Sequence, residues 1–333
     1  MKKLITCLVG FLLINGPAFS QTNGKMQKHR DGGPAKAVLF EINRTKDPAT
    51  GKVPREKYLQ ALQQTVDMKT DAALRGTAAF TWTERGPISD VPGPSNGNTR
   101  ANSGLASGRI RAVMVDSTDA TKKTVWIGGV DGGLWKTTDI TASSPTWTLV
   151  NDFLSNLAVA AICQDPRPGF QNIMYFCTGE SYYNADAVQG VGVFKSTNGG
   201  ATWSFLSSTS AFVNGTRILC DYLGNVYLAT RGSGLRRSTD GGTTWTNITP
   251  TGLVSDICDL EISSTSAAGR LHVVSGIFST QAYRYTDIPA TVAAGTWTAP
   301  AAAFPSFAMR CEIAVSGNTL YDCPANASFE VPT

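Results

Sequence analysis

Short apolar runs separated by polar turns fill the chain from about residue 109 to its end. The first group reads RIRAVMVD, VWIGGV, GLWKTT and TWTLV, and the second reads AVAAICQD, IMYFCTGE, GVFKST and TWSFL. Two further groups and the start of a fifth follow in the same order. Each run has the length of a strand, so each group predicts four antiparallel strands. Their recurrence predicts an all-β fold, a β-propeller with about five visible four-stranded blades, the last one incomplete.

The first 78 residues follow a different pattern. Residues 1–20 have a basic start, an apolar centre and small residues at the end, which predicts a signal peptide. Residues 21–78 form an N-terminal leader, of which residues 21–50 read as polar and loose. One helix is expected over 54–74, where Tyr58, Leu62 and Val66 form an apolar stripe. We therefore expect a secreted or cell-surface bacterial protein whose propeller spans residues 79–333.

Composition excludes several classes of function. The chain has 29 basic and 25 acidic residues, a balance too even for a nucleic-acid partner, and no run beyond the signal peptide approaches a membrane span. His29 and His272 are its two histidines, which excludes a histidine-based zinc site and disfavours a Ser-His-Asp arrangement. No phosphate-cradling loop is present, so we expect neither a metal nor a cofactor.

A Gly-rich turn recurs between the third and fourth strands of the blades. Its two best copies contain Ser196, Asn198, Gly200 and Trp203 in the second blade, and Ser238, Asp240, Gly242 and Trp245 in the third. The Asp or Asn side chain is expected to accept backbone hydrogen bonds in its own turn, and the glycine is expected to have a positive φ. The tryptophan then starts a strand and packs on the blade.

These turns resemble the Asp box, Ser/Thr-x-Asp-x-Gly-x-Thr-Trp, of secreted bacterial BNR-repeat propellers. The resemblance covers about residues 82–333 and points to the sialidase-like, sortilin-like and xyloglucanase-like superfamily. It implies a structural turn on the rim for Asp240 and Asn198, and a protein of the kind often labelled glycosyl hydrolase. Related exported proteins often use type IX secretion. Since such propellers close at about six to eight blades, we expect this chain to be truncated or part of a longer one.

Two arrangements could form an active or binding site. A sialidase-like site would clamp a substrate carboxylate with arginines, and Arg109, Arg217 and Arg310 stand at the first strands of blades one, three and five. A xyloglucanase-like site would need paired carboxylates. The candidates follow second strands: Asp131, Glu180 and Asp186.

Neither family's catalytic signature is intact. The sialidase Arg-Ile-Pro is replaced by Arg109-Ile110-Arg111, and Asp131 is displaced by one residue from the xyloglucanase position. Tyr182 and Tyr183 predict an aromatic-edged face that binds sugars or peptides. We therefore expect a glycan- or protein-binding module without catalysis, with a glycoside hydrolase and a structural adhesin as alternatives.

Six cysteines follow the signal peptide, an even number that permits disulfides in an exported protein. Cys311 and Cys323 lie symmetrically about Gly317, so a hairpin there is expected to bring them opposite each other in a disulfide. Cys163 and Cys177 flank another turn in a similar way. All six could instead be small buried apolar residues.

Overall fold

The computed structural model describes residues 108–182, 187–264, 269–288, 296–301, 310–317 and 319–325, with scattered positions between 39 and 68. The expected signal peptide, residues 1–20, lies outside the described residues. Within the expected helix over 54–74, the described positions 57, 60, 63–65, 67 and 68 are helical. The leader is not wholly loose, because Leu39, Ile42 and Asn43 are also helical.

Five antiparallel sheets follow one another along the chain. Sheet one is β1 (Ile110–Val115), β2 (Val125–Gly129), β3 (Leu134–Thr137) and β4 (Thr148–Leu149). Sheet two is β5 (Val159–Gln164), β6 (Met174–Thr178), β7 (Val193–Ser196) and β8 (Ser204–Phe205). A short 3₁₀ helix, η3 (Ser207–Thr209), leads to sheet three, which is β9 (Gly215–Cys220), β10 (Val226–Thr230), β11 (Leu235–Ser238) and β12 (Thr246–Asn247).

The last two described sheets are smaller. Sheet four is β13 (Ile257–Ser263), β14 (Arg270–Ser275) and β15 (Ala282–Asp287), and a single bridge between Tyr285 and Thr298 stands where a fourth strand would lie. Sheet five is the hairpin of β16 (Arg310–Ser316) and β17 (Thr319–Ala325). The strand order expected from the apolar runs is confirmed in each sheet.

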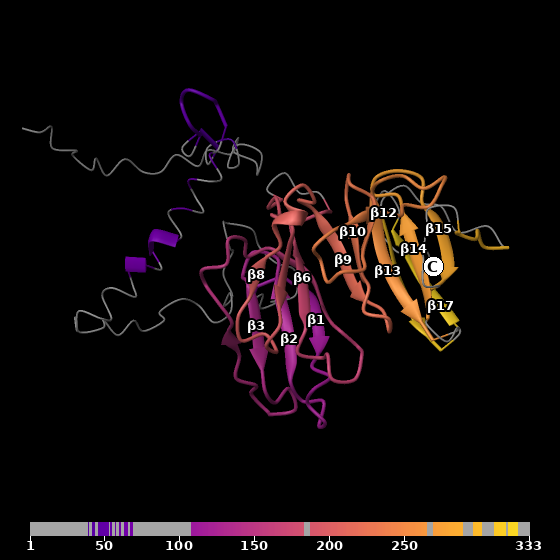
Figure 1. Ribbon diagram of the computed structural model, residues 1–333, viewed down its shortest axis with the longest axis horizontal. Coiled ribbons are helices and arrows are strands. Elements are labelled where there is room, and N and C mark those ends of the chain that lie inside the picture. Colours follow the sequence, from indigo (N-terminus) through magenta and orange to yellow (C-terminus); the bar gives the residue numbers. More distant parts are fainter. Residues whose placement is uncertain are drawn as a thin grey trace, which may run out of the picture.

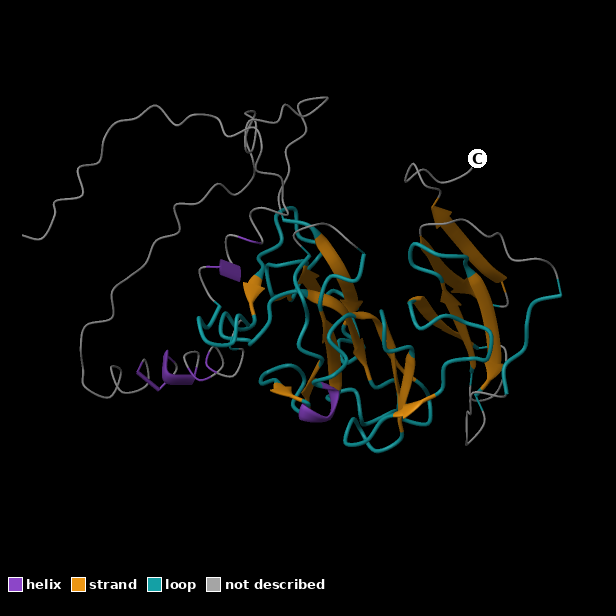
Figure 2. Ribbon diagram, turned by 90° about the horizontal axis from the view of Figure 1, so that it is seen from above, coloured by secondary structure: helices purple, strands orange, loops and turns teal. Residues whose placement is uncertain are grey.

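The first strands of the sheets lie next to one another. β1 contacts β5, β5 contacts β9, β9 contacts β13, and β13 contacts β16. The remaining strands of each sheet follow in chain order, as β1, β2 and β3 do in Figure 1, and Figure 2 shows the same sheets from above. Four-stranded antiparallel sheets joined at their first strands are the blades of a β-propeller, and the fold prediction is confirmed.

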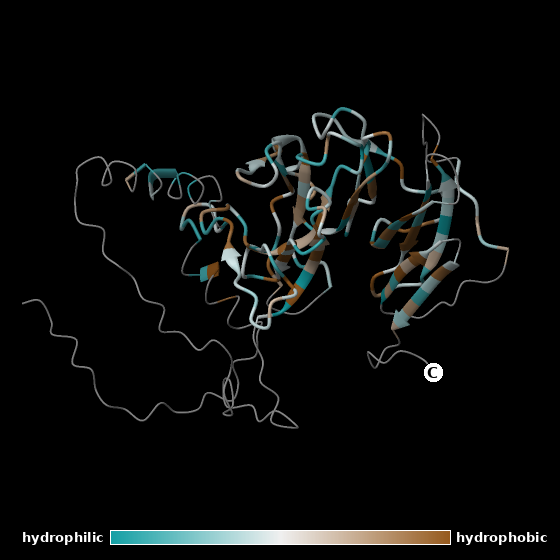
Figure 3. Cartoon of the chain, turned by 90° about the horizontal axis from the view of Figure 1, so that it is seen from below, coloured by the Kyte–Doolittle hydropathy of each residue, from teal (hydrophilic) through white to brown (hydrophobic). Residues whose placement is uncertain are grey.

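The hydrophobic core lies between consecutive blades. One apolar cluster, with Trp126 and Phe176, joins sheets one and two, and further clusters join sheets two and three, three and four, and four and five. Figure 3 shows the apolar colour along the strands and the polar colour over many turns. Sheets two, three and four therefore bury both faces against their neighbours, and their strands have buried residues on both faces.

The two Gly-rich turns have the hydrogen bonds of a local cap. Asp240 accepts bonds from Thr244 N at 2.9 Å and Thr244 Oγ1 at 2.6 Å, and Ser238 Oγ accepts one from Gly242 N at 2.8 Å. The second-blade turn repeats this arrangement with Asn198. The Trp203 and Trp245 indoles each donate to a carbonyl of their own turn, at Gly200 and Gly242.

Cys311 and Cys323 are not opposite each other. The β16–β17 register pairs Cys311 with Pro324 and Glu312 with Cys323, so the hairpin is centred between residues 317 and 318 and not on Gly317. A shift of one residue moves a side chain to the other face of a strand. Cys311 is buried, Cys323 is exposed, and both are free thiols, so the expected disulfide is absent.

Candidate functional site

A β-bulge recurs near the start of four first strands. The ladders skip one residue between positions 110 and 112 of β1, 159 and 161 of β5, 215 and 217 of β9, and 257 and 259 of β13. The unpaired residues are Arg111, Ala160, Thr216 and Cys258. A bulge bends its strand and re-aims the neighbouring side chains. All four bulges lie at the same end of the propeller.

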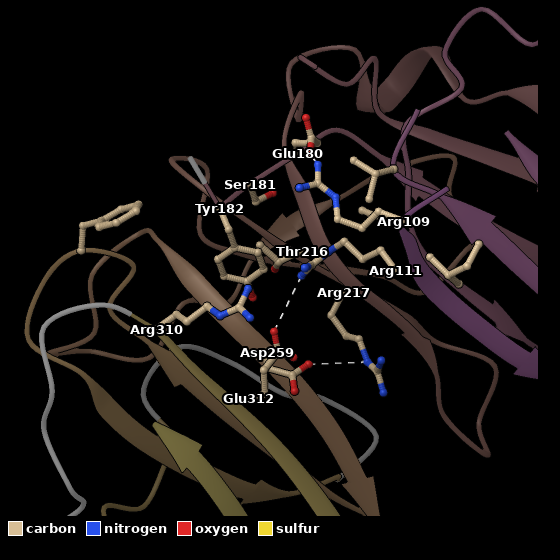
Figure 4. Close-up of a pocket in the computed structure, with 14 residues that line it drawn as sticks. Arg109, Arg111, Glu180, Ser181, Tyr182, Thr216, Arg217, Asp259, Arg310 and Glu312 are labelled. Atoms are coloured by element: carbon tan, nitrogen blue, oxygen red, sulfur yellow. Dashed lines mark hydrogen bonds and ion pairs between the residues drawn. The ribbon is translucent and has the colours of Figure 1, made fainter. Parts of the chain in front are cut away.

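A cavity of about 600 Å³ lies at this end of the first strands. Its walls come from all five sheets, and they carry four arginines and three carboxylates. The lining residues that carry its chemistry are Arg109, Arg111, Arg217, Arg310, Glu180, Asp259, Glu312, Tyr182 and Ser181. Figure 4 shows these side chains converging from different strands. The three arginines expected to form a clamp therefore do line one pocket.

Arg109 and Glu180 form an ion pair at the rim of the pocket. The same carboxylate accepts a hydrogen bond from Val188 N at 3.0 Å through Oε2. Burial and, second, the charge of Glu180 raise the pKa of Asp131 above its ordinary value. Asp131 itself does not line the pocket, whereas Glu180 does and is held there by Arg109.

Tyr182 lies at the centre of the pocket between two arginines. The guanidinium carbons of Arg111 and Arg310 lie 4.2 Å and 4.7 Å from the centre of its ring (Figure 4). Its hydroxyl donates a hydrogen bond to the Cys258 carbonyl at 2.6 Å, which fixes the ring against blade four. Burial holds the pKa of Tyr182 well above its usual range. The ring is therefore a neutral platform for two cations.

Arg217 faces the carboxylates of the next blade. Its Nη2 lies 2.5 Å from Glu261 Oε1, and its Nε lies 3.6 Å from Asp259 Oδ1. Asp259 also accepts hydrogen bonds from the Leu260 and Ile313 amides. Burial, only partly offset by Arg217, raises the pKa of Asp259 well above its ordinary range. Arg217 is thus already neutralised by protein groups.

Sequence reasoning missed Arg111, Asp259 and Glu312. The repeat contained a signal for Asp259, because Arg217 and Asp259 occupy the same position after the bulge in successive blades. Arg111 is a bulge residue, and bulges leave no mark in an apolar–polar pattern. Tyr183 and Asp186, the remaining candidates, lie outside the described residues.

No group of three or more His, Cys, Asp or Glu side chains in the part of the chain that the structure describes is arranged to hold a metal ion. Within the same residues, no helix is long and apolar enough to cross a membrane.

No protein-family model and no curated protein sequence matches the chain. Solved structures match it at low similarity. An ancestral GH74 enzyme is 19% identical, with a TM-score of 0.45, over 66% of this chain and 29% of that chain. The Niastella koreensis GH74 enzyme is 21% identical, with a TM-score of 0.44, over 58% and 29%. YCF48 bound to D1 peptide is 19% identical, with a TM-score of 0.38, over 57% and 54%. The chain thus spans less than a third of the two GH74 structures.

Proposed function

We propose that this chain is an exported Asp-box propeller that binds a glycan or protein ligand, and that the ligand places an acidic group in the axial pocket. The observation that carries this proposal is the pairing of the pocket's charges. Each lining carboxylate has an arginine partner: Glu180 with Arg109, Asp259 with Arg217, and Glu312 with Arg111. Carboxylates held in this way are poorly placed to serve as a nucleophile or acid.

Arg310 is the arginine that supports binding of an acidic group. Among the described residues it has no carboxylate partner, and its guanidinium rests on the face of Tyr182. A guanidinium stacked on a ring keeps its N–H edge available, and that edge matches a carboxylate in a two-point contact. Ligand binding at Arg310 therefore requires no ion pair between described residues to break.

Binding of carboxylated glycans and acidic peptides to the purified chain, measured by calorimetry, tests this proposal. Arg310→Ala should weaken binding at least tenfold, whereas Arg284→Ala, which removes an arginine from β15 outside the pocket, should leave it unchanged. Equal affinity of both variants and the wild type would contradict a site at Arg310. A glycan that binds when peptides do not, or the reverse, identifies the ligand class.

A glycoside hydrolase is the second candidate, because Asp131 and Glu180 differ in environment. The pKa of Asp131 is raised, which is the direction that a general acid requires, while Glu180 is held by the Arg109 guanidinium. A glycosidase needs two carboxylates in different environments, one of which donates a proton.

A hydrolysis screen with polysaccharides and aryl glycosides separates the two functions. Turnover that is lost in both Asp131→Asn and Glu180→Gln, with folding intact by circular dichroism, would replace the binding proposal by the enzyme. A binding module shows no turnover in the wild type. An adhesin role instead predicts attachment to surfaces that survives Arg310→Ala.

A further inference from the structure

Two cysteines from different blades have their sulfur atoms in contact. Cys163 lies in β5 of sheet two, Cys220 ends β9 of sheet three, and their Sγ atoms are 3.5 Å apart. β5 and β9 lie side by side but belong to different sheets, so no backbone ladder joins them. We propose that Cys163 and Cys220 are a modification site, which forms a disulfide between blades two and three when the protein meets an external disulfide oxidant.

The surroundings of the pair favour this bond over the other pairings. Cys163 stands opposite Tyr175 and Cys177 stands opposite Ala161, so Cys163 and Cys177 are not paired across β5 and β6. Cys311 and Cys323 are separated by the hairpin register described above. The sulfur–sulfur contact of Cys163 and Cys220 is not repeated by another pair among the described cysteines.

The two cysteines differ in burial. Cys163 is 7% exposed, and it belongs to the apolar cluster between sheets two and three. Cys220 is the less buried residue of the two, although burial still acts on its thiol. An exchange that begins at Cys220 leaves Cys163 placed to attack the resulting mixed disulfide.

The reaction is a thiol–disulfide exchange in two steps. The Cys220 thiolate attacks one sulfur of the oxidant RSSR, an S–S bond of the oxidant breaks, and RS⁻ leaves. The Cys163 thiolate then attacks the Cys220 sulfur, forms the protein disulfide and expels the second RS⁻. The two cysteines lose two electrons and two protons, and RSSR is reduced to two RSH.

The structure also indicates when the exchange is fast. The hydrogen bond with Cys163, followed by burial, holds the pKa of Cys220 well above its ordinary value. Asp165 and Asp221 act in the same direction through their charges. Since the thiolate is the attacking form, the exchange in the folded protein should be slow at neutral pH and should accelerate as the pH rises.

Thiol counting on the full chain treated with oxidised glutathione tests the proposal. We expect the folded protein to lose two thiols per chain without gaining glutathione, and a non-reducing peptide map to join the peptides of Cys163 and Cys220. Closing a loop of this length should raise the melting temperature by about 5–10 °C, and a reductant should reverse the shift.

Matched variants separate this pair from the other cysteines. Cys163→Ser and Cys220→Ser should each abolish the two-thiol loss, and Cys220→Ser should also prevent transient glutathione attachment. Cys311→Ser should retain the full loss. An unchanged thiol count in the wild type, a peptide map that joins other cysteines, or the same loss in Cys163→Ser would each overturn the proposal.

Discussion

Arg111 Nη2 of β1 and Glu312 Oε1 of β16 lie 3.8 Å apart. This ion pair joins the first and fifth described sheets at the pocket. The two residues come from opposite ends of the described propeller, and both flank Tyr182, the arginine by stacking on its ring (Figure 4). Side chains from every described blade thus share one local electrostatic field. A change in one charge of the pocket is therefore expected to alter the electrostatic energy of the other charged side chains.

Glu312→Gln should strengthen the binding of an acidic ligand. The substitution removes the carboxylate partner of Arg111 and leaves its guanidinium beside Arg310, which increases the positive charge of the pocket. We expect a several-fold lower Kd at low salt, and a smaller gain as salt increases and screens the charges. Calorimetric titration at two salt concentrations measures both effects. Arg111→Gln provides the opposite charge change, and an affinity that rises in both variants would contradict this account.

Asp259 should make the protein less stable as the pH rises above about 4. Its folded-state pKa is raised, chiefly by burial, so the folded protein holds a proton that the unfolded chain has released. The stability linked to that proton is present below the unfolded pKa and is lost as the pH rises through the folded pKa. The slope cannot exceed about 1.4 kcal/mol per pH unit for one group.

Urea unfolding of the wild type and Asp259→Asn between pH 4 and pH 8 measures this slope. At pH 4 the variant should be less stable than the wild type, because the asparagine side chain can accept only one of the two backbone N–H bonds that Asp259 accepts. The gap to the wild type should narrow as the pH rises. Asp322→Asn, at an exposed position of β17, is the control for removal of a carboxylate. A gap that stays constant with pH would show that Asp259 does not titrate in this range.

The apolar runs were sufficient to predict the blades, because nearly every run is a strand and the turns between them carry Gly, Asp or Asn; the TWTAP run of the fourth group forms only a single bridge. Trp203 and Trp245 even marked the strand starts to within a residue. It was harder to predict which residues stand opposite each other across a hairpin. The Cys311–Cys323 pairing depended on a hairpin centre displaced by half a residue, and apolar periodicity cannot resolve such a displacement.

The candidate site was predicted only in part, because its contacts between blades leave no local pattern in the sequence. Arg109, Glu180, Tyr182, Arg217 and Arg310 were selected from strand ends, and the structure gathers them in one pocket. Arg217, however, lies within β9 after the bulge and is engaged by Glu261, a contact between blades that no local pattern reveals. The charges that neutralise the arginines come from neighbouring blades, so they depend on tertiary structure.

Gly200→Ala should destabilise the protein more than Gly199→Ala. Both glycines have a positive φ, +81° and +67°, so both substitutions strain the backbone. At Gly200 a Cβ atom would also lie 2.3 Å from the buried Trp126 ring, whereas at Gly199 no atom lies within 4 Å. The backbone strain should cost about 1 kcal/mol in each variant, and the ring must move only in the first. The difference in melting temperature between the two variants measures the cost of the clash with Trp126. Equal melting temperatures would show that the Trp126 ring moves aside at no cost.

Asp240→Asn should be tolerated at neutral pH, while Asp240→Ala should lower the melting temperature by several degrees. The second blade already uses Asn198 in the same turn, where its Oδ1 accepts the Thr202 amide and its Nδ2 donates to Thr202 Oγ1. Asp240 accepts both bonds from Thr244, so the threonine hydroxyl needs only to reverse its role in the variant. Alanine supplies neither bond and leaves the turn without its cap.

Acid unfolding separates the charge of Asp240 from its hydrogen bonds. Bonds from the Thr244 hydroxyl and then its amide lower the pKa of Asp240 to about 2. Because the folded pKa is lower than the unfolded one, this stabilisation is present above pH 4 and is lost as the pH falls towards 2. Asp240→Asn removes the titrating group, so its melting temperature should fall less steeply than that of the wild type between pH 4 and pH 2. Parallel curves for the two proteins would show that the Thr244 bonds do not favour the ionised carboxylate.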